Sequence, residues 1–238
     1  MDDAPQLKHK YGRIDKDYAM ALATRAPEDD SPIYMVNLMK YHEVAQYTAD
    51  ARVDKPISGR EADDRYNPAS ILAKIGANMM FVGDVVKSHV GSEGWDRIAV
   101  VRYPSRKSFI DMQSRKDFSE KHVHKAAGMQ RTIIVCCRPQ DLSLDTRGRP
   151  QADDDRHIVM IVRRTSDRVA AFAAVPNAVN LTAEGTIIGD GRAWDTVQFV
   201  SVTSASDAEL LAKSVAATSN GDAYVMTVRA SMDAITQG

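Results

Sequence analysis

The sequence predicts an α+β fold built from two copies of one unit, in which a strand, a helix, two strands, a helix and a strand follow in order. The first observation is a repeated pair: Trp95-Asp96 and Trp194-Asp195 each follow a glycine-containing turn and each open a strand-like apolar run. The second is a polar linker, residues 141–155, rich in Asp, Arg, Gly and Pro, that separates the two copies. Differences between the two copies then indicate which copy carries a functional site.

The composition is that of an ordinary globular protein. The 238 residues are 44% hydrophobic and 26% charged, enough for one large or two small cores. Lys and Arg total 31 and Asp and Glu total 32, so a net charge of -1 leaves no basic footprint and we expect no nucleic-acid partner. No run approaches the ~20 apolar residues of a membrane span, and the charged start does not resemble a signal peptide. We therefore expect no membrane partner and a cytoplasmic location.

The chain is predicted to begin with an extension, residues 1–30, that carries one short helix, Lys16 to Arg25, started by Asp15. The first unit, residues 31–140, opens with the strand Ile33 to Tyr41. Because side chains alternate along a strand, this strand has two different faces. One face carries Val36 and Leu38, and the other carries Met35, Asn37 and Met39.

Two helices follow in the first unit. Ser58 and Glu61 form a capping box, and apolar residues recur at helical spacing up to Gly76. Ser105 starts the second helix, and Ser114 caps its continuation. The remaining strands of this unit are predicted at residues 78–86, 96–103 and 131–138.

The second unit, residues 156–238, repeats the pattern in a shorter form. Its strands are predicted at residues 157–163, 185–188, 195–202 and 223–229, and its helices at residues 167–175 and 208–217. This order of elements is that of the ferredoxin-like fold. The predicted fold class is therefore two tandem ferredoxin-like units that pair their sheets as a pseudo-dimeric α+β barrel.

The first unit resembles the dimeric α+β barrel superfamily and, within it, a branch known only as a domain of unknown function. The resemblance covers roughly residues 32–138 and rests on Asn37-Leu38-Met39-Lys40-Tyr41, Gly83-Asp84-Val85, Trp95-Asp96, Tyr103-Pro104-Ser105-Arg106 and Phe118. It implies a ligand cleft between the sheet and its covering helices. The superfamily includes cofactor-free monooxygenases of aromatic polyketides, small cyclases and isomerases, and haem proteins, so the fold does not fix the function.

His122 is the candidate catalytic residue, as a general acid or base. A helical projection places it beside Phe118 on the apolar face that covers the sheet, where an imidazole titrates near neutrality. The alternative is a core histidine held by one hydrogen bond. We expect no metal site, because His124 diverges from His122 on a helix and Cys136 and Cys137 are adjacent.

The candidate substrate-binding residues lie on the first strand and on the two helices of the first unit: Asn37, Lys40, Tyr41, Arg65, Tyr66 and Phe118. Asn37 either orients a ligand or pairs with the neighbouring strand. Lys40 and Tyr41 end the strand, where they position an anionic or phenolic group or form a rim. Arg65 and Tyr66 belong to residues 43–66, a stretch that the second unit lacks and that is therefore a candidate lid.

The leading functional hypothesis is a cofactor-independent enzyme that acts on a small, partly apolar metabolite by acid/base chemistry: cyclisation, isomerisation or oxygenation. One alternative is a haem-binding protein with His122 as axial ligand. Another is a non-catalytic small-molecule-binding or assembly protein whose cleft is filled by side chains. No Walker loop, dinucleotide fingerprint or Gly-x-Ser-x-Gly elbow occurs in its required context. Both a monomer and a homodimer are compatible with the sequence.

Overall fold

The computed structural model describes residues 11–48, 51, 55–146, 152–219 and 222–236, so parts of the predicted extension, insertion and linker lie outside the described residues. The first part of the chain forms β1 (Arg13–Ile14), α1 (Lys16–Ala23), η1 (Pro27–Asp29), β2 (Ile33–Tyr41), α2 (Gly59–Tyr66), α3 (Ala69–Lys74), β3 (Asn78–Val90), β4 (Arg97–Tyr103), α4 (Arg106–Gln113), α5 (Lys116–Gly128) and β5 (Met129–Pro139). The second part forms η2 (Leu142–Thr146), β6 (Ala152–Arg163), α6 (Arg168–Ala173), β7 (Val179–Gly189), β8 (Thr196–Val202), α7 (Ala205–Thr218) and β9 (Ala223–Asp233).

Eight long strands form one closed antiparallel barrel. Their order around the barrel is β7-β5-β2-β4-β3-β9-β6-β8, and β8 pairs with β7 to close it. The short strand β1 pairs antiparallel with the end of β7, at Ile188 and Gly189. Among the described residues, each of the eight strands therefore has a hydrogen-bonded neighbour on both sides.

The predicted fold class, two tandem ferredoxin-like units forming a pseudo-dimeric α+β barrel, is wrong. The two halves do not keep separate sheets: β3 pairs with β9 from Phe81 and Asp233 to Val90 and Val225, and β5 pairs with β7. All eight strands therefore belong to a single closed antiparallel barrel. Periodicity identifies strands but not the distant partner of each strand edge, and this is why the sequence pattern misled the prediction.

The interior of the barrel is a packed core rather than a channel. Phe81 from β3 and Phe199 from β8 are both fully buried, and their ring centroids lie 5.1 Å apart, so the two halves meet there. At one end of the barrel, Tyr224 of β9 packs against Trp95 and Trp194, with ring centroids 5.7 and 4.8 Å away. The repeated tryptophans thus belong to one shared cluster.

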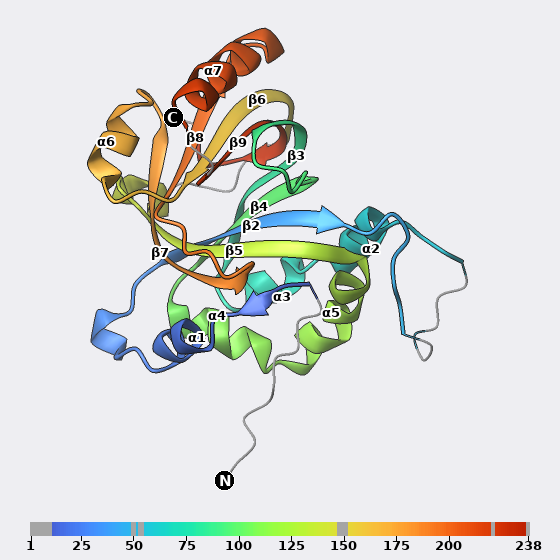
Figure 1. The fold of residues 1–238 in the computed structure, drawn as a ribbon. Helices are drawn as coiled ribbons and strands as arrows, with labels where there is room; N and C mark the ends of the chain where they lie inside the picture. The colour runs from blue at the N-terminus through green and yellow to red at the C-terminus, as the bar shows by residue number, and fades with distance from the viewer. Residues whose placement is uncertain (1–10, 49–50, 52–54, 147–151, 220–221, 237–238) are drawn as a thin grey trace.

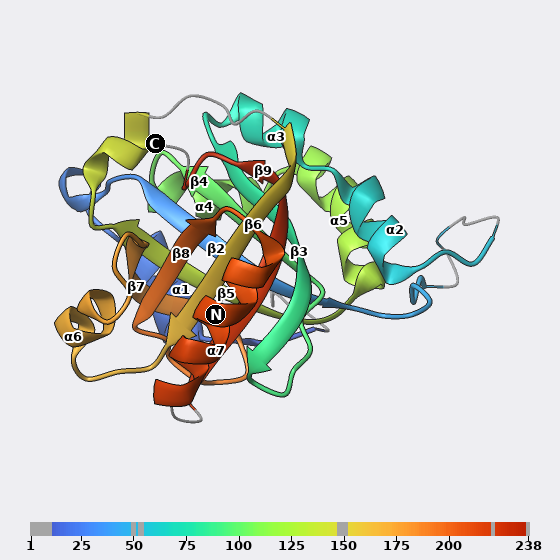
Figure 2. The same ribbon diagram turned by 90° about the horizontal axis from the view of Figure 1, so that it is seen from above.

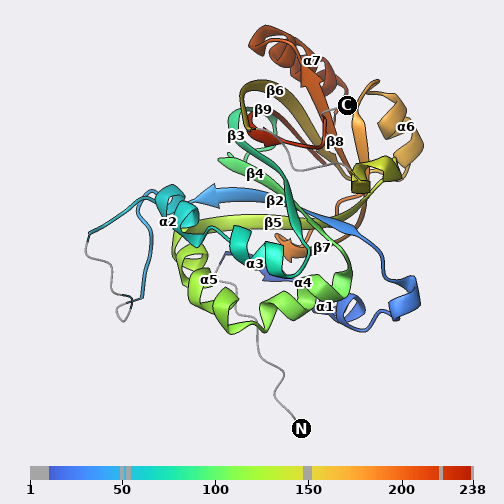
Figure 3. The same ribbon diagram turned by 180° about the vertical axis from the view of Figure 1, so that it is seen from behind.

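Helices cover the outside of the barrel on two sides. Figure 1 shows α1, α3, α4 and α5 on one side and α6 and α7 on the other, and Figure 3 shows the first group from behind. Seen from above, α7 lies across β6 and β9 (Figure 2). In β2, Val36 and Leu38 face the barrel interior while Met35 packs with the helices, as the alternation predicts. Nearly all of β2 is therefore buried on both faces.

A buried ion cluster ties the N-terminal segment and α4 to β7. The Arg106 side chain is 0% exposed, and its Nε donates to Oε1 of Glu184 at 2.7 Å while Nη1 donates to Oδ1 of Asp30 at 3.2 Å. Hydrogen bonds from Arg106 hold the pKa of both carboxyl groups below their usual range. Both carboxylates therefore pair with the buried guanidinium of Arg106, and this pairing holds α4 against the barrel.

Candidate functional site

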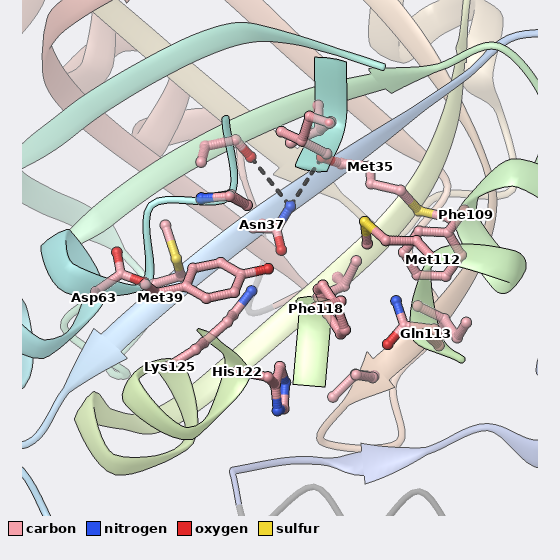
Figure 4. A pocket seen from close by; sticks show the side chains of 18 of the residues that line it. Met35, Asn37, Met39, Asp63, Phe109, Met112, Gln113, Phe118, His122 and Lys125 are labelled. Atoms are coloured by element: carbon pink, nitrogen blue, oxygen red, sulfur yellow. Dashed lines mark hydrogen bonds between the residues drawn. The ribbon is translucent and has the colours of Figure 1, made fainter. Parts of the chain in front are cut away.

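A cavity of about 320 Å³ lies between the outer face of the first-half strands and the helices that cover it (Figure 4). Its wall is mostly apolar. The apolar lining comes from the N-terminal segment, β2, β3, β4, β5, β7 and the covering helices, and includes Ile14, Met35, Met39, Leu72, Met79, Val101, Phe109, Ile110, Met112, Phe118, Ile134, Ile187 and Ile188. Met80, by contrast, packs inside the barrel. A cavity of this size and lining suits a small, mostly apolar molecule.

The polar part of the cavity exists because α2 and α5 cross at unusually short range. A Cβ on Gly59 would lie 2.4 Å from the carbonyl oxygen of Gly128, so only glycines allow the two backbones to approach this closely. Asp63 lies one turn into α2, and Lys125 lies one turn before the end of α5. The crossing therefore brings this carboxylate and this ammonium group to the same part of the cavity (Figure 4).

Lys125 extends its amine into this cavity. Its Nζ lies 5.3 Å from the centroid of the Tyr66 ring, and among the described residues it has no hydrogen-bond acceptor. Burial lowers the pKa of Lys125, while the nearby charge of Asp63 partly opposes that shift. The two groups form no ion pair, so the amine is available to a ligand.

Asp63 is the acidic counterpart of Lys125. Its side chain is 10% exposed; Tyr41 Oη donates to its Oδ2 at 2.6 Å, and Arg97 Nη1 lies 3.5 Å from the same oxygen. Burial raises the pKa of Asp63, although Lys125 and the Tyr41 hydrogen bond oppose the shift. Oδ1 has no hydrogen-bond partner among the described residues, and this leaves one carboxylate oxygen for a ligand or a proton.

Asn37 presents an acceptor to the cavity. Its Nδ2 donates to the carbonyl oxygens of Met35 at 3.0 Å and Ala99 at 3.5 Å (Figure 4). Because both partners are acceptors, the amide nitrogen must face them, and Oδ1 must then face the cavity. The side chain thus pairs with the neighbouring strand, one of the two alternatives, and its oxygen faces the cavity.

His122 lines the cavity one turn before Lys125. Its Nε2 lies 2.9 Å from the hydroxyl of Tyr11, a residue of the N-terminal segment. Burial raises the pKa of Tyr11, so the neutral phenol is the donor in this pair and Nε2 is the acceptor. The ring also packs 5.2 Å from Phe118 and 6.3 Å from Tyr66, centroid to centroid.

This geometry does not fit the alternative of haem binding. An axial ligand needs a ring nitrogen directed at the iron, whereas His122 Nε2 is engaged by Tyr11. Phe118 and Tyr66 also pack against the imidazole, with ring centroids 5.2 and 6.3 Å away. We therefore draw no step through haem.

Tyr66 and Phe118 form the aromatic wall of the cavity. Their ring centroids lie 6.2 Å apart with the planes at 81°, the edge-to-face arrangement that aromatic pairs favour. The Tyr66 hydroxyl makes no hydrogen bond with any described residue, and burial raises its pKa well above the usual value. It stays a neutral phenol that is able to donate to a ligand.

Three predicted binding residues do not line the cavity. Lys40 Nζ donates to Asp96 at 2.8 Å, beyond the end of the cavity, and Arg65 Nη2 donates to Glu61 at 3.2 Å on the exposed side of α2. Tyr41 acts only indirectly, through its hydrogen bond to the Asp63 carboxylate. The structure therefore brings Asn37, Tyr66, Phe118 and His122 together and leaves out Lys40, Tyr41 and Arg65.

The polar residues of the cavity that were missed include Tyr11, Asp63 and Lys125. Lys125 and Asp63 carried a signal in the sequence. Lys125 follows Phe118 by seven positions, which is two turns of the same helix face, and Asp63 precedes Tyr66 by three. Tyr11 carried none, because nothing in the sequence relates the N-terminal segment to the cavity.

Other site types have no counterpart among the described residues. In this part of the chain no three His, Cys, Asp or Glu side chains are grouped to hold a metal ion, and His124 points away from the cavity to Tyr47. No described helix has the length and apolarity to cross a membrane.

No protein-family model matches the sequence, and no curated protein matches it. A solved structure of the methylated RPA0582 protein is similar in part, at 24% identity and a TM-score of 0.46, covering 55% of this chain and 97% of that chain. A second structure, of the RPA0582 protein of unknown function from Rhodopseudomonas palustris, is 22% identical with a TM-score of 0.44 and covers 54% and 95%. These similarities assign no activity to the chain.

Proposed function

We propose that the protein is an enzyme that binds a small, mostly apolar molecule in the helix-covered cavity and moves a proton on it without a resident cofactor. The supporting observation is the placement of Asp63 and Lys125: an acid and an amine meet in an apolar cavity without pairing with each other. Burial raises the pKa of Asp63 and lowers the pKa of Lys125, and opposed shifts of this kind are typical of groups that transfer protons.

The ionisable groups around Asp63 have distinct roles in the proposed reaction. Asp63 is the acid or base, and Tyr41 is a positioning residue that holds its carboxylate by a 2.6 Å hydrogen bond. Lys125 stabilises negative charge that develops on a substrate oxygen when a proton leaves carbon. His122, held by Tyr11, lies one turn away on the same helix and is the second candidate for carrying the proton.

Exchange of carbon-bound protons tests this proposal directly. We expect the wild-type protein to accelerate exchange of the α-protons of cyclohexanone in D₂O, followed by NMR, because this reaction needs an acid, a base and no cofactor. Asp63→Asn should slow the exchange about 10²-fold or more, the usual contribution of a general acid or base. Asp111→Asn is the matched control, since Asp111 lies on the exposed side of α4 and pairs with Lys107.

The same assay separates the competing interpretations. If His122→Ala loses as much exchange as Asp63→Asn, His122 shares the proton transfer, as the sequence predicted. Binding of cyclohexanone without any acceleration would contradict the enzyme and favour the non-catalytic binding protein.

A further inference from the structure

We propose that Lys125 is a nucleophile: its Nζ forms an imine with the carbonyl carbon of a small, mostly apolar aldehyde or ketone. This inference rests on the proposed function, because it names the substrate class of the same cavity. It also gives Lys125 a covalent role in place of a purely electrostatic one.

The surroundings of Lys125 are those of a nucleophilic amine rather than of a structural ion pair. Nζ lies over the Tyr66 ring at 5.3 Å and has no acceptor among the described residues, whereas Lys116, on the same helix, is 91% exposed. A lysine becomes nucleophilic when an apolar pocket disfavours its charged form. The apolar wall around Met39 and Phe118 supplies that pocket.

Asp63 supplies the proton transfers that imine formation requires. The neutral amine of Lys125 adds to the carbonyl carbon, the carbonyl oxygen takes up a proton, and nitrogen loses one to give a carbinolamine. Asp63 in its acid form then protonates the hydroxyl, which leaves as water while the nitrogen lone pair forms the C=N bond. No oxidant or reductant is consumed. Burial of Asp63 supports this role, because it raises the pKa of the carboxyl group and so favours the acid form that this step uses.

The other polar groups of the cavity favour a particular kind of carbonyl compound. Asn37 Oδ1 only accepts hydrogen bonds, so it favours a substrate with a hydroxyl or N–H group near the carbonyl. The Tyr66 hydroxyl donates to an oxygen of the substrate. The apolar remainder of the molecule then lies among the methionines and Phe109.

Reductive trapping tests the imine. The full-length protein is incubated at pH 7 with phenylacetaldehyde, and in parallel with cyclohexanone, in the presence of sodium cyanoborohydride, and the modified lysine is located by peptide mass mapping. We expect Lys125 to be modified at least about tenfold faster than Lys116, because the apolar cavity binds the probe beside Lys125 and favours its neutral amine. Lys116→Met is the matched control and should leave the trapping at Lys125 unchanged.

Two further variants keep the test decisive. Lys125→Arg retains a cation but forms no trapped amine, so it should lose the adduct even if Lys125→Met fails to fold. Asp63→Asn should slow trapping at Lys125. Modification of Lys125 at the rate of Lys116 with both probes would overturn the imine. Proton exchange without trapping would overturn the imine and keep the proposed function; trapping without exchange would keep the imine and overturn proton transfer.

Discussion

At the scale of single residues, the cavity places two ionisable groups where neither charge is well solvated. Asp63 is 10% exposed and Lys125 has no hydrogen-bond acceptor among the described residues, yet the two do not form an ion pair. Burying charges that are not fully paired costs stability. Such a cost is expected at a functional site, where a raised or lowered pKa serves the chemistry.

This cost predicts a pH dependence for Asp63→Asn. Burial raises the pKa of Asp63 in the folded state above the pKa of about 4 in the unfolded state. The protonated side chain therefore contributes its full stabilisation below the unfolded-state pKa, and this contribution is lost as the pH rises through the folded-state pKa. The amide cannot ionise, and its oxygen still accepts from Tyr41. The unfolding free energy of Asp63→Asn, relative to wild type, should therefore increase from pH 4 to pH 7 in urea titrations.

The opposite trend would show that Arg97 and Lys125 lower the pKa of Asp63 by more than burial raises it. Asp111→Asn serves as the control, because Asp111 is exposed and its variant should show little change between the two pH values.

Sequence reasoning reached part of the site at this scale. The helical projection found Phe118 and His122, and the strand alternation found Asn37, because each lies on an apolar face whose period is visible in the sequence. Lys125 lies on the same face, but the sequence alone predicts a solvent-exposed side chain for a lysine. Arg65 was chosen as the neighbour of Tyr66, although one step along a helix turns a side chain by about 100° and takes it out of the cavity.

At the scale of elements, the site depends on the crossing of α2 and α5. His42, in the loop that follows β2, fixes the crossing: its N–H donates to the Gly128 carbonyl at 2.9 Å, and its own carbonyl accepts from Gly59 at 3.0 Å. The crossing thus links the strand that carries Asn37 to the helices that carry Asp63 and Lys125.

Gly59→Ala should pull this crossing apart. The added Cβ would lie 2.4 Å from the Gly128 carbonyl oxygen and 2.5 Å from that of His42, so the backbone must shift. We expect a loss of about 1–3 kcal/mol in unfolding free energy, as for other overpacked sites, together with lower proton exchange and slower trapping at Lys125. Gly94→Ala is the comparison: no atom lies within 4 Å of its Cβ, but its φ is positive, so it reports backbone strain alone. Unchanged trapping in Gly59→Ala would show that the crossing does not position Lys125.

The element boundaries were largely predictable, because short-range chemistry sets them. Asp15, Ser58 and Ser105 accept hydrogen bonds from the first turns of α1, α2 and α4, as predicted. The predicted cap at Ser114 was wrong: Ser114 ends α4, and Arg115 precedes α5 without a side-chain cap. A serine is compatible with both the end of one helix and the start of the next, and the sequence alone did not distinguish these two positions.

At the scale of the whole molecule, closure of the barrel was not predictable. The alternation in each strand determines which side chains face inward. It does not determine which strand pairs with a free strand edge, because any strand of similar pattern can form those hydrogen bonds. The choice of β9 for β3 and of β7 for β5 is made by residues far apart in the chain, such as Phe81 and Phe199, whose packing has no local signature.

A closed barrel predicts one cooperative unfolding transition, whereas independent units at residues 31–140 and 156–238 would unfold separately. The chain contains two tryptophans, and both pack against Tyr224, so Trp95→Phe and Trp194→Phe each leave one fluorescent reporter where the halves meet. We expect the two variants to report coincident urea transitions by fluorescence and circular dichroism. Phe199→Ala, made in each background, should cost about 3–5 kcal/mol and shift both reporters together, because Phe199 is fully buried against Phe81 of the other half. If the fluorescence midpoint differs from the circular-dichroism midpoint, the halves unfold independently, and the barrel closure contributes no cooperativity.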